Sequence, residues 1–274
     1  MSKTIFDILK KDIDLKKEID KLNKLFSVKK IVKVQADYGD EIIEITYSEL
    51  CDKYLYLWEF RNTWICLYDI ETEIGVHLWR NPSVEMTCIL YCELILNMQK
   101  FISTKIKKKN YKIYIDDGIL IGNVKLLIER LNYTIVDEPN KVTLVKKNVD
   151  AELAAIAIDD NDISIDILKY NDTRIKDNIK EKSVILFNIY KYYEGEKKKI
   201  KQNNSKLCNL IDNIYNNSNI RHNNEKGYKE NINFTKLERE EILKLYDELY
   251  FLIIYALRIP KILDIMDEHK NSDN

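Results

Sequence analysis

Glycine and proline are scarce in this chain, with six and three among 274 residues. Both residues interrupt regular structure, and glycine supplies many of the tight turns that join short strands. Their scarcity excludes the glycine-rich loops that bind phosphates and dinucleotides, and it favours long helices over a turn-rich all-β fold. The sequence also lacks the GxSxG, HExxH and zinc-finger spacings, so most familiar catalytic motifs are absent.

A strong charge of one sign is also missing. The 44 basic and 45 acidic residues leave a net charge of -1, so the molecule as a whole has no bias toward nucleic acid. The segment Met1–Lys11 has no apolar signal core, and the apolar run Tyr250–Leu257 is too short to span a bilayer. We therefore expect a cytoplasmic protein that does not enter the membrane.

Clusters with metal-ligand spacing are few. Cys88 and Cys92 lie four residues apart in an apolar pattern, but no histidine or second cysteine pair joins them, which favours core thiols over a metal site. Asp159, Asp160 and Asp162 lack the glycine turn and distal glutamate of a calcium loop, which favours a helix start. The sequence predicts no metal site and no cofactor.

Hydrophobic periodicity predicts a mixed N-terminal half. Apolar residues recur at helical spacing in four segments, and alternate with polar residues around two turns. The expected helices are Phe6–Phe26, a helix from a Ser48 cap through Ile70, Ser83–Ile106 and Asp116–Leu131, and the expected hairpins turn at Tyr38–Asp40 and at Glu138–Lys141.

The second half is helical almost throughout. Asp150 is expected to cap a short helix, and an apolar seam runs from Glu181 to Ile214. Thr235 should cap the last helix, which Pro260 should bend or end. We predict a mainly α protein of the α+β class, with a mixed α/β domain at 1–155 that contains short β-hairpins, and a helical bundle at 156–274.

One polar stretch, NNSNIRHNNEKGY at 216–228, concentrates groups that could do chemistry. Arg221 can place two donors on a phosphate, and His222 can exchange a proton near neutral pH. Asn217 and Asn223 could orient them, and such a set suits metal-independent cleavage of RNA. The structural alternative is that the asparagines cap helices while Arg221 and His222 bond helix-end carbonyls or pair with acids.

Residues 181–259 resemble a HEPN-type helical domain. In that family an arginine followed by a polar residue, and shortly afterwards by a histidine, forms a metal-independent endoribonuclease site that is usually completed across a homodimer. Arg221 and His222 match the first two positions. The place of the second histidine is taken by Glu225, Lys226, Gly227 and Tyr228. This departure implies that His222 has taken over the acid–base role, that Tyr228 marks a modified site, or that nuclease activity is lost.

Two basic runs could guide RNA. They are Lys105–Lys109 and the run that begins with Lys197, Lys198 and Lys199, although lysines on exposed helical faces usually serve solubility. Aromatic residues around Arg61 could stack on bases, but packing in the N-terminal core is favoured. These aromatic residues are Tyr54, Tyr56, Trp58, Phe60 and Trp64.

The resemblance places the chain among bacterial anti-phage, abortive-infection-like proteins. The favoured prediction is a C-terminal domain that dimerises, senses or binds a ligand without catalysis. The alternative is an endoribonuclease that uses Arg221 and His222. The expected partners are a second copy bound through the C-terminal helices, RNA, and a phage component or partner protein.

Overall fold

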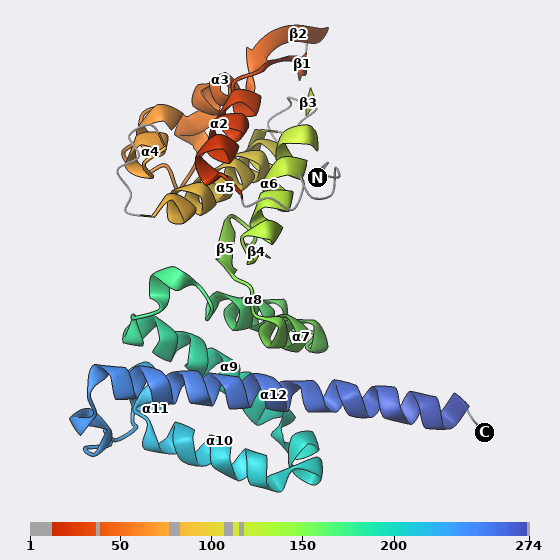
Figure 1. The fold of residues 1–274 in the computed structure, drawn as a ribbon. Helices are drawn as coiled ribbons and strands as arrows, with labels where there is room; N and C mark the ends of the chain where they lie inside the picture. The colour runs from red at the N-terminus through yellow and green to blue at the C-terminus, as the bar shows by residue number, and fades with distance from the viewer. Residues whose placement is uncertain (1–12, 37–38, 77–82, 107–111, 115–117, 273–274) are drawn as a thin grey trace, which may run out of the picture. The chain divides into compact units, whose positions relative to one another are not determined.

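The computed structural model describes residues 13–36, 39–76, 83–106, 112–114 and 118–272. Within them the protein is mainly helical with a few short antiparallel strands, which confirms the predicted fold class (Figure 1). None of these described helices is both long enough and apolar enough to cross a membrane.

The chain forms two compact units, Met1–Leu144 and Val145–Asn274, each with its own hydrophobic core. The sequence placed the boundary between residues 155 and 156. Helix α7 (Val149–Ala157) instead groups with the second unit, because Ala151 and Ala154 are fully buried in that unit's core.

The unit Met1–Leu144 contains two small antiparallel sheets among its helices. The first has the strand order β2-β1-β3, with Lys29 of β1 opposite Thr46 of β2, and the second pairs β4 with β5. Both hairpins were predicted, whereas the third strand of the first sheet was not. The described elements are α2 (Leu15–Phe26), β1 (Lys29–Ala36), β2 (Gly39–Thr46), α3 (Tyr47–Tyr54), η1 (Leu55–Leu57), α4 (Leu67–Glu73), α5 (Val84–Phe101), η2 (Ile102–Ile106), β3 (Lys112–Tyr114), α6 (Gly118–Arg130), β4 (Tyr133–Asp137) and β5 (Val142–Lys146).

Helix α5 is the centre of this core. The Ser83 hydroxyl accepts a hydrogen bond from the Met86 backbone N–H at 3.2 Å and so caps the helix that the sequence predicts over Ser83–Ile106. Cys88 and Cys92 on this helix are fully buried free thiols, in agreement with the core reading. Across the ranges that the structure describes, no group of three or more His, Cys, Asp or Glu residues is placed to hold a metal ion.

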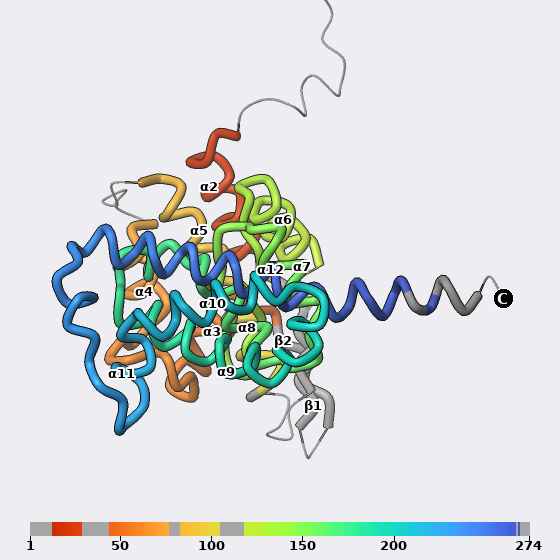
Figure 2. Tube along the Cα trace, turned by 90° about the horizontal axis from the view of Figure 1, so that it is seen from below, coloured from red at the N-terminus to blue at the C-terminus, as the bar shows by residue number. Residues whose placement is uncertain are grey.

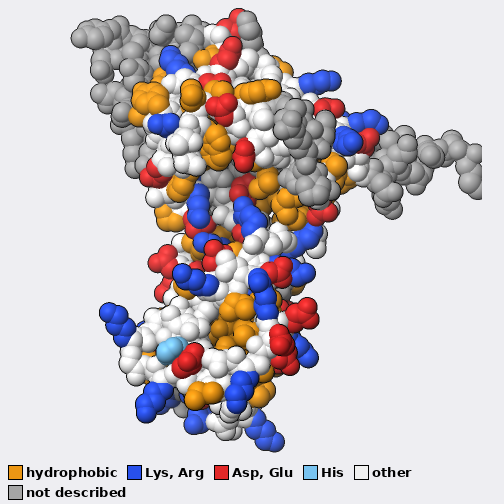
Figure 3. Space-filling view, turned by 90° about the vertical axis from the view of Figure 1, so that its left-hand side faces the viewer, with side chains coloured by type: hydrophobic (Ala, Val, Ile, Leu, Met, Phe, Trp, Pro, Cys, Tyr) orange, Lys and Arg blue, Asp and Glu red, His pale blue; other side chains and the backbone are white. Residues whose placement is uncertain are grey.

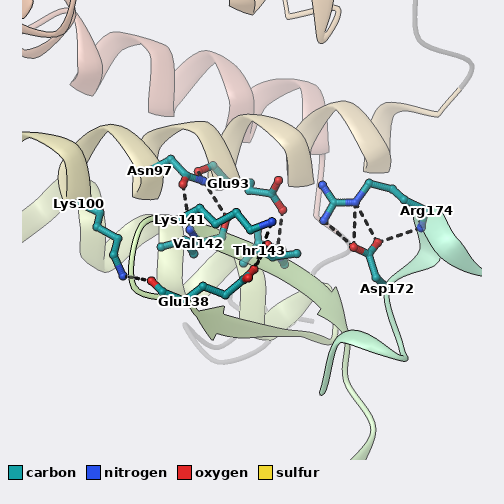
Figure 4. A network of polar contacts seen from close by, with 10 residues as sticks. Glu93, Asn97, Lys100, Glu138, Lys141, Val142, Thr143, Asp172 and Arg174 are labelled. Carbon is teal, nitrogen blue, oxygen red and sulfur yellow. Dashed lines mark hydrogen bonds and ion pairs between the residues drawn. The ribbon is translucent and has the colours of Figure 1, made fainter. Parts of the chain in front are cut away.

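The β4–β5 hairpin is fixed to α5 by polar side chains (Figure 4). The side-chain amide of Asn97 donates to the Val142 carbonyl at 2.8 Å, and its oxygen accepts from the Val142 backbone N–H at 2.9 Å. This is the pair of bonds that a neighbouring strand would make. A carboxylate oxygen of Glu93 accepts from the Leu144 amide at 2.7 Å, and Lys100 donates to the Glu138 carbonyl. These contacts satisfy strand groups that a two-stranded sheet leaves open.

The helix expected from Ser48 through Ile70 is wrong. Thr46, not Ser48, caps α3 through a reciprocal pair of hydrogen bonds with Glu49, and the chain leaves helical geometry between η1 and α4. Trp58 and Trp64 in this connection pack partly on the core, while Tyr56 and Phe60 are exposed. Aromatic residues at every second position do not fall on one face of a helix. The loop instead lets both tryptophans pack partly on the core.

Within the residues described, the unit Val145–Asn274 is built from helices, apart from the last two residues of β5 at its start (Figure 1). The predicted seam is its core: Leu186, Ile189 and Tyr193 of α9 are buried, and so is Ile211 of α10. Its elements are α7 (Val149–Ala157), α8 (Asn161–Lys169), η3 (Thr173–Ile175), α9 (Ile179–Asn203), α10 (Ser205–Asn217), α11 (Ile220–Asn224), η4 (Phe234–Lys236) and α12 (Arg239–Ser272).

The seam predicted over Glu181–Ile214 is divided between two helices, α9 and α10, which meet at Asn204. This residue has φ -147° and ψ 77°, and its side chain accepts from the Leu207 amide at 3.0 Å to start α10. Asparagine favours caps over helix interiors because its side chain competes for backbone groups. The two halves of the seam therefore fold back on each other as an antiparallel pair.

Two expected helix caps are also corrected. Asn148, not Asp150, caps α7, with its side chain accepting from the Ala151 amide at 3.1 Å. Thr235 does not cap the last helix, because its hydroxyl donates to the Ile232 carbonyl at 2.8 Å within the turn η4. Of the two outcomes expected at Pro260, a bend or an end of the helix, the end is excluded, because α12 continues to Ser272. The helix start expected at the cluster of Asp159, Asp160 and Asp162 is confirmed, since the Asp160 carboxylate caps α8.

Candidate functional site

Arg221 and His222 lie on α11, a five-residue helix that follows α10. Ile220 and Asn219, directly before them, are buried at 0% and 4% exposure and fix α11 against the bundle. Arg221 and His222 follow as the chain reaches the surface, with Arg221 partly buried and His222 exposed. The local pattern of one buried anchor followed by polar residues therefore places both side chains at the rim of the bundle.

Arg221 is surrounded by groups of its own unit. Its Nη2 lies 3.5 Å from both carboxylate oxygens of Glu194 on α9, and its Nε lies 3.6 Å from Oε2 of Glu225. The guanidinium stacks over the Tyr228 ring at 4.5 Å and lies 5.8 Å from the Tyr215 ring. Burial opposes the charge, but Glu194 and its neighbours outweigh burial, so the pKa of Arg221 is raised.

His222 has a different partner. Its Nδ1 lies 2.7 Å from the Tyr228 carbonyl oxygen. A carbonyl can only accept, so this contact assigns the proton to Nδ1 and, in the neutral ring, leaves Nε2 as an acceptor. The loop returns to His222 through Gly227, whose φ of +94° a side chain would disfavour. Tyr228 thus meets both candidate residues, with its ring on Arg221 and its carbonyl on His222.

Asn217 and Asn223, which were predicted to orient Arg221 and His222, make their described hydrogen bonds elsewhere. The Asn217 amide donates to the carbonyl and the side-chain oxygen of Asn213, both at 2.8 Å. Asn223 is exposed, and its backbone N–H donates to the Asn219 carbonyl at 2.9 Å. Both residues therefore lie near the motif without contacting Arg221 or His222 through these bonds.

Three other asparagines of the stretch and its loop hold the backbone together. The Asn219 side chain accepts from the Asn231 amide at 2.7 Å, and the Asn231 side chain donates to the Asn217 carbonyl at 2.9 Å. The Asn224 side chain donates to the Ser183 hydroxyl at 2.8 Å and so fastens α11 to α9. These bonds give the asparagines a structural role, but as ties from α11 to its loop and to α9, whereas the helix caps that the structural alternative expected are not among them.

The second basic run is largely neutralised. Lys197 Nζ lies 2.5 Å from Oδ2 of Asp212 on α10, and Lys199 pairs with Glu196 at 3.3 Å, while Lys198 is exposed. Over Val145–Asn274, basic and acidic side chains are interspersed on the face shown in Figure 3. The side chains of the first basic run, Lys105–Lys109, lie outside the described residues.

Glu194 and Glu225 are the site residues that sequence reasoning missed. Arg221 and Glu225 are four residues apart on neighbouring turns, a spacing that commonly forms ion pairs in helices. Glu194 lies 27 residues before Arg221 and has no local signal. Lys191, 3.7 Å from Glu225, completes a row of alternating charges.

The hollows described in this unit lie away from the pair. One, of about 520 Å³, is lined by residues of η3, the start of α9 and Arg239. Another, of about 510 Å³, lies along α12 between Glu240 and Phe251. Neither includes Arg221 or His222, so these hollows add no substrate cleft to the pair.

Comparison with other proteins adds no identity to this geometry. No family model matches the chain, and no curated protein or solved structure matches it either. The HEPN resemblance therefore rests on the residues of the motif alone and stays a prediction.

Proposed function

We propose that the unit Val145–Asn274 is a non-catalytic module that binds a partner, including a second copy of the chain. The observation that carries this proposal is the enclosure of Arg221 by Glu194, Glu225 and Tyr228. A phosphate would have to displace two carboxylates to reach the guanidinium, and their charge would repel it. These ion pairs therefore help to hold α11 and the segment after it against α9.

The biological setting is part of the same proposal. The HEPN resemblance suggests a bacterial protein that acts in the cytoplasm against phage, in the manner of abortive-infection proteins. In this proposal the unit Met1–Leu144 senses a phage component or a partner protein, and the helical unit supplies self-association. The paired charges around Lys197 and Lys199 support a protein partner over RNA.

A second candidate function is metal-independent endoribonuclease activity. It is favoured by the exposed His222 ring, whose Nδ1 contact with the Tyr228 carbonyl leaves Nε2 able to accept a proton. A base in that state could activate a ribose hydroxyl beside Arg221. This function requires Arg221 to leave Glu194 and Glu225 when substrate binds.

The test is incubation of the full chain with bacterial RNA in EDTA, beside an Arg221→Ala/His222→Ala double variant. We expect intact RNA in both samples. Cleavage by the wild type alone, with circular dichroism showing both proteins folded, would overturn the non-catalytic proposal in favour of the nuclease.

A variant designed to gain RNA binding tests whether the Glu194 and Glu225 carboxylates keep phosphates away from Arg221. Glu194→Gln/Glu225→Gln removes both carboxylate charges while keeping the side-chain shapes. We expect the wild type to bind a fluorescent single-stranded RNA no tighter than Arg221→Ala, and the glutamine variant to bind roughly tenfold tighter, the effect of about 1.4 kcal/mol. Equal RNA binding by the wild type and the glutamine variant would contradict the blocking role of the carboxylates.

A further inference from the structure

Helix α12 extends past the bundle that it helps to form. Among its described side chains, Ile259 is the last that packs on the unit's core. The helix nevertheless continues to Ser272, and Figures 1 and 2 both show it running beyond the other helices of Val145–Asn274. Ile262, Ile265 and Met266 on this extension are 49%, 44% and 50% exposed. A short helical segment with an uncovered apolar side is marginal by itself, so a partner would stabilise it.

Ile262 and Ile265 on the extension continue a heptad that begins with two residues before it. Tyr255, Arg258, Ile262 and Ile265 are separated by alternating steps of three and four residues, the spacing of the a and d positions of a coiled coil. Ile259 and Met266 flank this seam at e positions, and Lys261 and Glu268 flank it on the other side at g positions. Arg258, which interrupts the seam, donates to Asp150 of α7 at 2.7 Å.

We propose that two copies of the chain pair through antiparallel α12 extensions, centred between Ile262 and Ile265. This inference deepens the self-association part of the proposed function and rests on that part alone, not on Arg221 or His222. In this register Ile262 packs against the partner's Ile265, and Ile259 lies opposite the partner's Met266. Lys261 then meets the partner's Glu268, and the twofold symmetry repeats each contact.

Charge complementarity selects this register over its neighbours. A shift by one heptad, which brings Tyr255 against the partner's Ile265, would set Lys261 against the partner's Lys261. A parallel pair would set Lys261 against the partner's Met266, an apolar side chain. Only the antiparallel register centred between Ile262 and Ile265 joins isoleucine layers with two opposite-charge pairs.

The seam is short, so the pairing should depend on protein concentration. From Ile259 to Glu268 it spans about 15 Å, at roughly 1.5 Å per residue. An interface of this size falls at the small, transient end of protein contacts. We expect a monomer–dimer equilibrium with a Kd in roughly the micromolar range.

Sedimentation equilibrium of the full chain tests the proposal through charge reversal. Lys261→Glu and Glu268→Lys each place like charges across the seam, and we expect either variant to raise the dimer Kd at least about tenfold. The double variant Lys261→Glu/Glu268→Lys restores opposite charges and should restore the wild-type Kd. Asp264→Lys, a reversal at an exposed site off the seam on the same helix, should leave the Kd unchanged.

Cysteine cross-linking tests the orientation. A mixture of Ile262→Cys and Ile265→Cys proteins should form disulfide dimers faster than either variant alone, whereas a parallel pair would favour the single variants. A chain that stays monomeric at all concentrations would overturn the inference, and so would a dimer that ignores both charge reversals. The second result would keep self-association through another surface, and RNA cleavage in EDTA remains a separate readout for the proposed function.

Discussion

Arg221 is held by two carboxylates that reach it in different ways. Glu225 lies one helical turn further along the chain, while Glu194 comes from α9, 27 residues earlier. The Arg-His motif is visible in the sequence. The ion-pair partners of the arginine are not, because they depend on which side chain of α9 faces α11. The contact with Glu194 thus gives Arg221, a candidate phosphate-binding residue, a structural role in the bundle.

Some asparagines around the motif are buried and bonded to the backbone, and others are exposed. The two kinds should contribute differently to the free energy of unfolding. Asn219 is buried, and its side chain satisfies the Asn231 amide. Asn219→Ala should lower the free energy of unfolding by about 1–3 kcal/mol, because a buried backbone donor loses its partner. Asn223→Ala, at an exposed site, should change it by less than about 0.5 kcal/mol in the same urea titration. Equal effects of the two variants would contradict this division.

Helix α9 is tied to its neighbours by buried tyrosines and one buried lysine. Lys182 is 5% exposed, lies 2.6 Å from Asp247 of α12, and sits 4.6 Å from the centre of the Tyr170 ring. Tyr170 donates to the same carboxylate at 2.8 Å, and Tyr250 stacks on Tyr170. Asp247 itself is exposed, and its removal would leave the buried ammonium of Lys182 without this carboxylate.

These contacts predict loss of stability at alkaline pH. Burial is the largest cause that raises the pKa of Tyr170, followed by the Asp247 carboxylate, and burial also raises the pKa of Tyr190, Tyr215 and Tyr250 above the usual 10.0. The folded state therefore keeps protons that the unfolded chain releases. Stability should be full below about pH 10 and fall as pH rises above it.

Phenolate absorption in the near ultraviolet measures this effect. In the native protein only part of the 18 tyrosines should ionise near the usual pKa, with the rest following as the protein unfolds. In urea all should ionise together. A native titration identical to the urea titration would contradict the buried tyrosine cluster.

At the scale of the whole molecule, the two cores predict that the C-terminal unit folds by itself if it includes α7. Arg258 of α12 donates to Asp150 of α7, and Ala151 and Ala154 are fully buried against the bundle. A fragment of residues 145–274 should be helical and unfold cooperatively. A fragment that starts at 156, the boundary expected from sequence, should unfold at a lower temperature or aggregate, because it exposes the apolar surface under α7.

Circular dichroism melting of the two fragments compares the two boundaries. Equal melting temperatures would mean that α7 adds no stability to the unit. The sequence missed this assignment because the switch from strands to helices suggested a boundary after α7. In fact alanine spacing on α7 already marks a buried face, but not which unit buries it.

Local patterns were enough to predict the helical class, both hairpins, the helix starts near Ser83 and Asp160, and the apolar seam of α9 and α10, because periodicity and capping act between residues a few positions apart. The break at Asn204, the pairing of Lys197 with Asp212 and the contact of Arg221 with Glu194 emerge only in the folded bundle. Ion pairs and burial depend on which faces meet across the bundle, and residues far apart in the chain leave no local pattern that reveals this.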